Sequence, residues 1–98
     1  MVDNFVITLT TSAQQIVSGR KAIREIHVQP EFTNANPYFL GGFKVSTTTG
    51  QRMPAPNSTT EFPPHVIDGF EDGKMSADEW YVVGTAGEKV RVMLITYT

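Results

Sequence analysis

The C-terminal segment carries the pattern that most restricts the fold of this chain. From Lys89 to Tyr97, side chains alternate along the sequence, so that Val90, Val92, Leu94 and Thr96 fall on one face. A period of two is typical of a β-strand with one buried face, and this face is therefore predicted to be core. The opposite row begins with charged residues and ends with apolar ones, which predicts that its distal half is also covered.

The rest of the chain repeats this extended pattern in shorter pieces. Phe5, Ile7 and Leu9 lie on one face of an N-terminal strand, and Lys21 to Gln29 alternates again before Pro30 ends it. Further short strands are expected at 14–17, 38–40, 43–46 and 80–83, with a one-turn helix over 12–17 as the alternative to the first of these. The glycines of Gly84–Glu88 predict a hairpin connection into the last strand.

Two other segments are expected to lie outside the sheets. The arm from about 53 to 64 holds four of the six prolines, and proline cannot donate to a strand ladder, so at most a short strand over 59–62 is expected there. The stretch from about 66 to 78 is acidic and is expected to be a mobile excursion. With 98 residues, the chain fits one domain over 1–98.

Some seven to eight short strands with frequent turns, and no long helical pattern, define the expected fold class. It is an all-β, single-domain antiparallel β-sandwich of jelly-roll-like form. A domain this small buries only roughly 60% of its unfolded surface, so oligomerisation is a natural way to gain stability.

Composition argues against several classes of function. The net charge is −2 and no basic run is present, which disfavours nucleic-acid binding. The absence of cysteine removes thiolate metal sites and cysteine nucleophiles. No stretch approaches the length of a membrane helix, and the acidic N-terminus does not resemble a signal peptide, so no membrane contact is expected.

The residues suited to chemistry are few and scattered. His27 lies mid-strand, and His65 is expected in a loop after two prolines. Neither a G-x-S-x-G nor an H-E-x-x-H motif occurs, and the acidic stretch lacks the spacing of a calcium loop. We therefore expect no catalytic residues, no metal ligands and no cofactor, and we predict that the protein is not an enzyme.

The aromatic residues leave a carbohydrate-binding module open as an alternative. Trp80, Tyr81, Tyr38 and Phe39 are candidates for stacking on sugar rings. Aromatic side chains fill cores and subunit interfaces more often than they form such platforms, and that is the expected use here.

Three stretches resemble small structural proteins of tailed-bacteriophage virions. The stretch from Asn34 to Gly50 is similar to a pattern N-x-x-P-Y-x-x-G-G-x-x-V-S-T-x-x-G, and Tyr81 to Val92 is similar to Y-V-x-G-T-A-G-E-K-V-R-V. The opening Ile7 to Gln15 also resembles these proteins. The chain departs from the pattern after Gly50 and in its long acidic segment.

The resemblance implies a capsid decoration (cement) protein, made in the host cytoplasm, that binds the outer head surface and stabilises contacts between major capsid protein subunits. It also implies a homo-oligomer, in particular a trimer. A tail, fibre or neck component of the virion is the first alternative, and the carbohydrate-binding module is the second. Partner contacts are expected from the N-terminal strand and the Pro-rich arm, at Phe5, Ile7, Met53, Pro54, Pro56 and Phe62.

Overall fold

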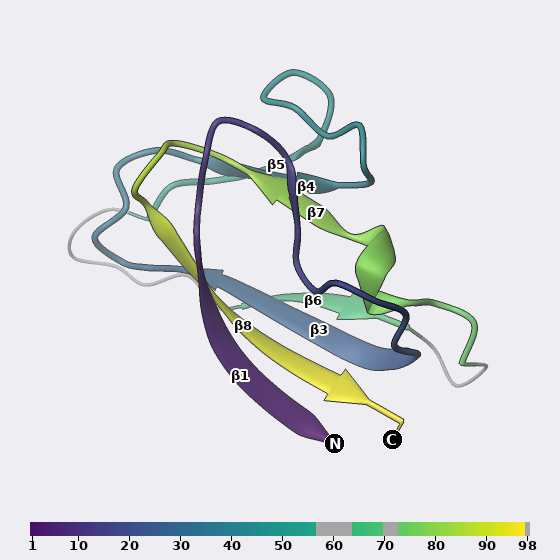
Figure 1. Cartoon of the computed structure of the whole chain (residues 1–98). Coiled ribbons are helices and arrows are strands. Elements are labelled where there is room, and N and C mark those ends of the chain that lie inside the picture. Colours follow the sequence, from purple (N-terminus) through teal and green to yellow (C-terminus); the bar gives the residue numbers. More distant parts are fainter. Residues whose placement is uncertain (57–63, 70–72, 98) are drawn as a thin grey trace.

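The computed structural model describes residues 1–56, 64–69 and 73–97. These residues form eight β-strands and one short 3-10 turn (Figure 1). In chain order the elements are β1 (Val2–Thr8), β2 (Gln14–Gln15), β3 (Ile23–Pro30), β4 (Tyr38–Gly41), β5 (Gln51–Met53), β6 (His65–Asp68), η1 (Ala77–Glu79), β7 (Tyr81–Val83) and β8 (Lys89–Thr96).

The strand pairing is that of a jelly roll. The first strand pairs with the last, β2 with β7, β3 with β6 and β4 with β5, all antiparallel, as in one long hairpin. The long hairpin then folds up, so that β8 also pairs with β3 and β7 also pairs with β4. Two four-stranded sheets result, β1-β8-β3-β6 and β2-β7-β4-β5, and they lie as two layers in Figure 1. The predicted all-β sandwich of jelly-roll-like form is confirmed.

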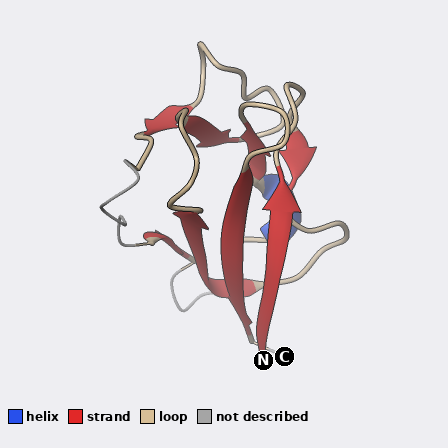
Figure 2. Cartoon of the chain, turned by 90° about the vertical axis from the view of Figure 1, so that its left-hand side faces the viewer, coloured by secondary structure: helices blue, strands red, loops and turns tan. Residues whose placement is uncertain are grey.

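The core lies between the two sheets and is supplied by the predicted face of β8. Val90, Val92, Leu94 and Thr96 are buried, whereas Lys89 on the other face is exposed. In β1 the same alternation buries Ile7 and half-buries Phe5. The two chain ends lie side by side (Figure 2), because the Met1 amino group donates to the Thr96 carbonyl at 3.0 Å.

A bulge changes the inward row of β3. The pairing of β3 with β8 shifts between Ile23 and Glu25. An extra residue in one strand reverses the side-chain alternation beyond it. Both Ile23 and Ile26 are therefore fully buried, although strict alternation places them on opposite faces.

The segment 84–88 is a connection between the sheets and not the predicted hairpin. The strands it joins belong to different sheets. Its backbone bonds instead to the segment after β1, with Gly87 N–H donating to the Leu9 carbonyl and Gly84 N–H to the Thr10 carbonyl. The expected left-handed glycine conformation is present at Gly87, where φ is 91°.

The expected strand at 43–46 is also absent, and a compact turn takes its place. Hydroxyl groups compete for the backbone there, since Ser46 N–H donates to the Thr49 side chain at 3.0 Å. The buried Val45 side chain folds back over Gly41 and Gly50, where any larger residue would meet it. Glycine at these two positions therefore allows the Val45 side chain to approach the backbone closely within the turn.

Two strands form where the pattern did not predict them. β5 reads Gln-Arg-Met and carries no apolar alternation, and β6 occupies the start of the segment expected to be an acidic excursion. The end of that segment is also structured, because Ser76 and Ala77 are buried and Ser76 bridges to Ala22. The short strand predicted over 59–62 lies outside the described residues. The 14–17 segment contains the two-residue strand β2 rather than a helical turn.

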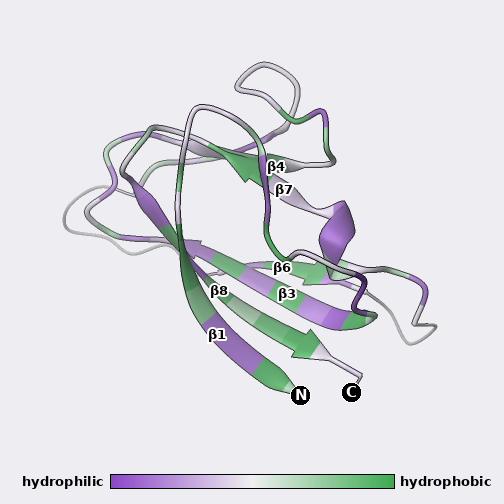
Figure 3. Cartoon of the chain, in the orientation of Figure 1, coloured by the Kyte–Doolittle hydropathy of each residue, from purple (hydrophilic) through white to green (hydrophobic). Residues whose placement is uncertain are grey.

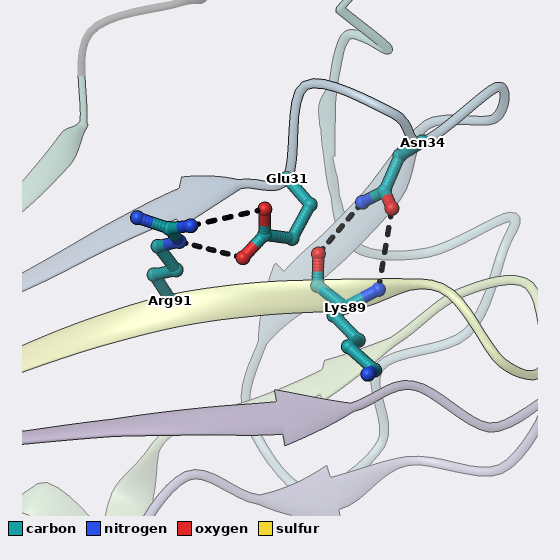
Figure 4. A network of polar contacts seen from close by, with 4 residues as sticks. All are labelled: Glu31, Asn34, Lys89 and Arg91. Carbon is teal, nitrogen blue, oxygen red and sulfur yellow. Dashed lines mark hydrogen bonds and ion pairs between the residues drawn. The ribbon is translucent and has the colours of Figure 1, made fainter.

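A buried amide fixes the loop that follows β3. The Asn34 side chain donates to the Lys89 carbonyl at 2.7 Å and accepts from the Lys89 N–H at 3.3 Å (Figure 4). Beside it, Arg91 and Glu31 form a two-bonded ion pair. These contacts join the loop to the first residues of β8.

Replacing Asn34 by alanine is expected to destabilise the domain by about 1–3 kcal/mol, because both Lys89 backbone groups would lose a partner. Chemical denaturation of the purified chain measures this change. Asn36→Ala is the matched control, since Asn36 is exposed and its amide makes a 3.3 Å bond to Glu88. Equal stabilities of the two variants would contradict the assigned role of Asn34.

Candidate assembly surface

The outer face of the sheet β1-β8-β3-β6 carries an unusual share of the exposed apolar side chains. We use the name outer face for the side of this sheet that points away from the core. Its apolar members come from three strands: Val2 and Val6 of β1, Val66 of β6, and Met93 and Ile95 of β8. Figure 3 shows the green, hydrophobic stretches along these strands.

The strand register places these side chains side by side. Val2 lies opposite Ile95, and Val6 lies opposite Arg91. Across the middle of the sheet, Met93 pairs with Asn4 on one side and with His27 on the other, and His27 pairs in turn with Val66. The apolar groups therefore gather on β1 and β8, and the polar outward row of β3 (Glu25, His27 and Gln29) separates them from Val66.

Two pairs of polar side chains lie at the outer face. His27 Nε2 lies 2.7 Å from a carboxylate oxygen of Glu25, two residues earlier on the same strand. Arg91 is held by Glu31 through the pair described above. A shallow depression of about 530 Å³ lies between Val6, His27, Arg91 and Met93. It is open to solvent and has room for side chains of a partner.

Exposed apolar residues gather on this sheet rather than scattering over the molecule. Of the seven large hydrophobic residues that are exposed among those described, five belong to β1, β6 and the residues flanking β1 and β8. They are Met1, Val2, Val6, Val66 and Tyr97. Exposed apolar residues that gather on one face often mark interaction sites in soluble proteins.

A second apolar feature lies at the Pro-rich segment. A pocket of about 270 Å³ is lined by Met53, Pro54, Tyr38 and His65, together with residues of β3 and Pro64. The Tyr38 side chain is almost fully buried, and this burial raises the pKa of its phenol above the ordinary value. The phenol therefore stays neutral at physiological pH.

The structure places the predicted partner-contact residues in different environments. Met53 and Pro54 come together in the pocket, with Pro54 exposed, and their contact with a partner stays a prediction. Ile7 and Pro56 are buried in the folded chain, and Phe5 is half-buried against the core. Phe62 lies outside the described residues.

Sequence reasoning missed the side chains that form the outer face. Val2 and Val6 occupy the row of the N-terminal strand opposite Phe5 and Ile7, so the alternation itself contained the signal. No comparable signal in the sequence pointed to Val66, because β6 lies in a segment that reads as polar and irregular.

The four aromatic residues considered for sugar stacking are buried or half-buried. Tyr38 is 1% exposed, and Trp80 packs against the core with its indole nitrogen buried. The exposed phenylalanines, Phe32 and Phe43, lie in two separate loops. Phe39 and Tyr81 are half-buried on the adjacent strands β4 and β7, and the carbohydrate-binding alternative stays a prediction.

The two histidines lie on strands of the same sheet. His27 is a hydrogen-bonded strand residue, as expected, but His65 begins β6 opposite Val28 and is not in a loop. Among residues 1–56, 64–69 and 73–97, no three His, Asp or Glu side chains come together in a way that could hold a metal ion. In the same part of the chain, no helix has the length and apolar character needed to cross a membrane.

Comparisons with protein-family models, with curated proteins and with solved structures find no match for this chain. The phage-protein resemblance of its motifs therefore stays a prediction from the sequence.

Proposed function

We propose that this chain is a bacteriophage capsid decoration protein, a non-catalytic jelly-roll domain that binds the head surface and stabilises contacts between major capsid protein subunits. The binding is assigned to the outer face of the sheet β1-β8-β3-β6. The protein acts through buried interface area and not through chemistry.

The fold class is compatible with this role. Jelly rolls recur in viral capsid and lectin domains and in cupins. A fold alone does not define a function, so the choice among these depends on the site. Tyr38 is buried and Trp80 packs against the core, which leaves these two rings little surface for stacking on a sugar.

The observation that carries the proposal is the clustering of exposed apolar residues on one sheet face. Val2 and Val6 are 58% and 55% exposed, and they lie opposite the half-buried Ile95 and the exposed Arg91 of β8. Apolar anchors surrounded by polar groups are typical of protein interfaces. The Arg91–Glu31 and Glu25–His27 pairs supply such polar groups here.

The proposal is tested by copy number and by head binding. Mass spectrometry of purified phage particles that carry this gene should find the chain at a near-equal ratio to the major shell protein. A few copies per particle would favour a tail, fibre or neck component instead, and absence from particles would overturn a virion role.

Head binding is then measured with heads that lack the protein. Wild-type chain should co-sediment with them saturably, and Met93→Lys should weaken binding at least tenfold, because it places a charge in the middle of the outer face. Phe43→Ser is the matched control, since Phe43 is 70% exposed but lies in a loop away from this face. Loss of binding with Phe43→Ser alone would place the contact at the loop.

A further inference from the structure

The open side of β1 presents a row of backbone groups with a defined direction. Met1 and Thr96 exchange two backbone hydrogen bonds, of 2.9 and 3.0 Å, and Leu9 N–H donates to the Glu88 carbonyl at 2.7 Å. Residues of an antiparallel strand alternate between bonding toward one neighbour and toward the other side. Odd-numbered residues of β1 therefore bond to β8. The N–H and C=O groups of Val2, Asn4 and Val6 point to the other side, where no strand of the described residues pairs with β1.

This edge is long compared with the other edges of the two sheets. β1 has seven residues, whereas the edge strands β2, β5 and β6 have two, three and four in the described part of the chain. Edges are protected by lysine or other charged side chains, by proline or by a bulge. β1 has no lysine, no proline and no shift in its pairing with β8, and Asp3 is its single charged residue. An edge of this kind is suited to the addition of another strand.

We propose that the occupant of this edge is β1 of a second copy, paired antiparallel about a two-fold axis at Asn4. In this register Val2 faces the partner's Val6, Asn4 faces the partner's Asn4, and Asp3 faces the partner's Phe5. The side chains of Val2 and Val6 lie on the outer face, so the valine pairs join the two outer faces into one surface. The two copies then share a continuous eight-stranded sheet.

Neighbouring registers are disfavoured by features of the chain. A shift toward the N-terminus centres the axis on Asp3 and places two carboxylates directly opposite each other, which is destabilising. A shift the other way centres it on Phe5 and requires Thr8 to bond to the partner's Val2. The Thr8 carbonyl already accepts the Gln14 side-chain amide at 2.9 Å, so this position is occupied.

A two-fold pair also suits the edge better than the trimer that the sequence resemblance implies. A two-fold interface uses the same strand from both copies, whereas a ring of three needs a second, different edge on each copy. A five-residue strand pair is small compared with the roughly 1,000 Å² of a stable interface, so the dimer is expected to depend on protein concentration. The proposal does not rest on capsid binding.

Sedimentation equilibrium of the full chain, without any capsid, tests the pairing. We expect a monomer–dimer equilibrium, and Val6→Lys should raise the dissociation constant at least tenfold. Val66→Lys is the matched control, because Val66 is an exposed valine on the outer face of the opposite edge strand. A strict monomer at millimolar concentration, a trimer, or equal effects of the two variants would overturn the proposal.

Single cysteines test the register, because the native chain contains none. Directly paired residues lie about 5.5 Å apart between Cα atoms, which a disulfide can span. Asn4→Cys should therefore form a disulfide-linked dimer under mild oxidation, and Val6→Cys should not, since the partner's Val6 lies four residues along the strand. Far-UV circular dichroism confirms that both variants fold. Cross-linking of Val6→Cys, or of neither variant when dimers are present, would refute the register.

Discussion

Leu94→Ala is expected to lower the free energy of unfolding by about 3–5 kcal/mol, the cost of removing a fully packed leucine and leaving a cavity. Leu94 is 1% exposed and lies in β8, one of the two inner strands of its sheet. It is paired with Asp3 of β1 on one side and with Ile26 of β3 on the other. A domain of this size is typically stable by about 5–15 kcal/mol, so the loss is a large part of the total. Urea denaturation followed by tryptophan fluorescence measures it through Trp80.

The adjacent residue provides the control. Ile95 is only half-buried, because it lies on the outer face of the same strand. Ile95→Ala should cost about 1 kcal/mol or less, since little apolar surface returns to water. If the two variants were equally destabilised, the assignment of the two faces of β8 would be wrong.

Gly69→Ala should be nearly as damaging, at about 3 kcal/mol, because the space beside Gly69 is occupied by backbone. A β-carbon there would lie 2.2 Å from the Ile23 carbonyl oxygen. Gly69 N–H also donates to the Arg24 carbonyl at 2.7 Å, so the added methyl would push apart the end of β6 and the bulge of β3. Thermal unfolding should show a clearly lower midpoint than the wild type.

Gly42→Ala is the matched control for this substitution. A β-carbon at Gly42 meets nothing within 4 Å, and the residue has no left-handed backbone conformation. Its stability should stay within about 0.5 kcal/mol of the wild type, as for most surface substitutions. A large loss of stability for Gly42→Ala, together with no loss for Gly69→Ala, would contradict the packing described for the two glycines.

The proposed head contact and the proposed pairing of two copies use neighbouring parts of one sheet and share Val2 and Val6. Side chains such as Met93 lie in the middle of the face, whereas the backbone groups of β1 that pair with no strand of the described residues lie at its border. Head binding by Met93 variants and self-association by Val6 variants are measured in different assays. One can therefore fail without the other.

The amino-acid sequence by itself determined the fold class and the inward rows of the longest strands. Alternation is a local property, so β8 and β1 and the burial of Leu94 and Ile7 were predictable from neighbouring residues alone. The same alternation placed Val2 and Val6 on the other row of β1, although their exposure was not recognised as a site.

Tertiary structure decided which strands pair, and with that the location of the candidate surface. Local pattern does not report that β7 and β8 separate into different sheets, because the turn between them bonds to Leu9 and Thr10 from the other end of the chain. β5 reads Gln-Arg-Met and forms because its partner strand offers hydrogen bonds, and the short β6, with Val66 and Ile67, is fixed by its pairing with β3. The open edge of β1 likewise exists only because the long hairpin folds with its first strand outermost, a choice made by contacts between residues far apart in sequence.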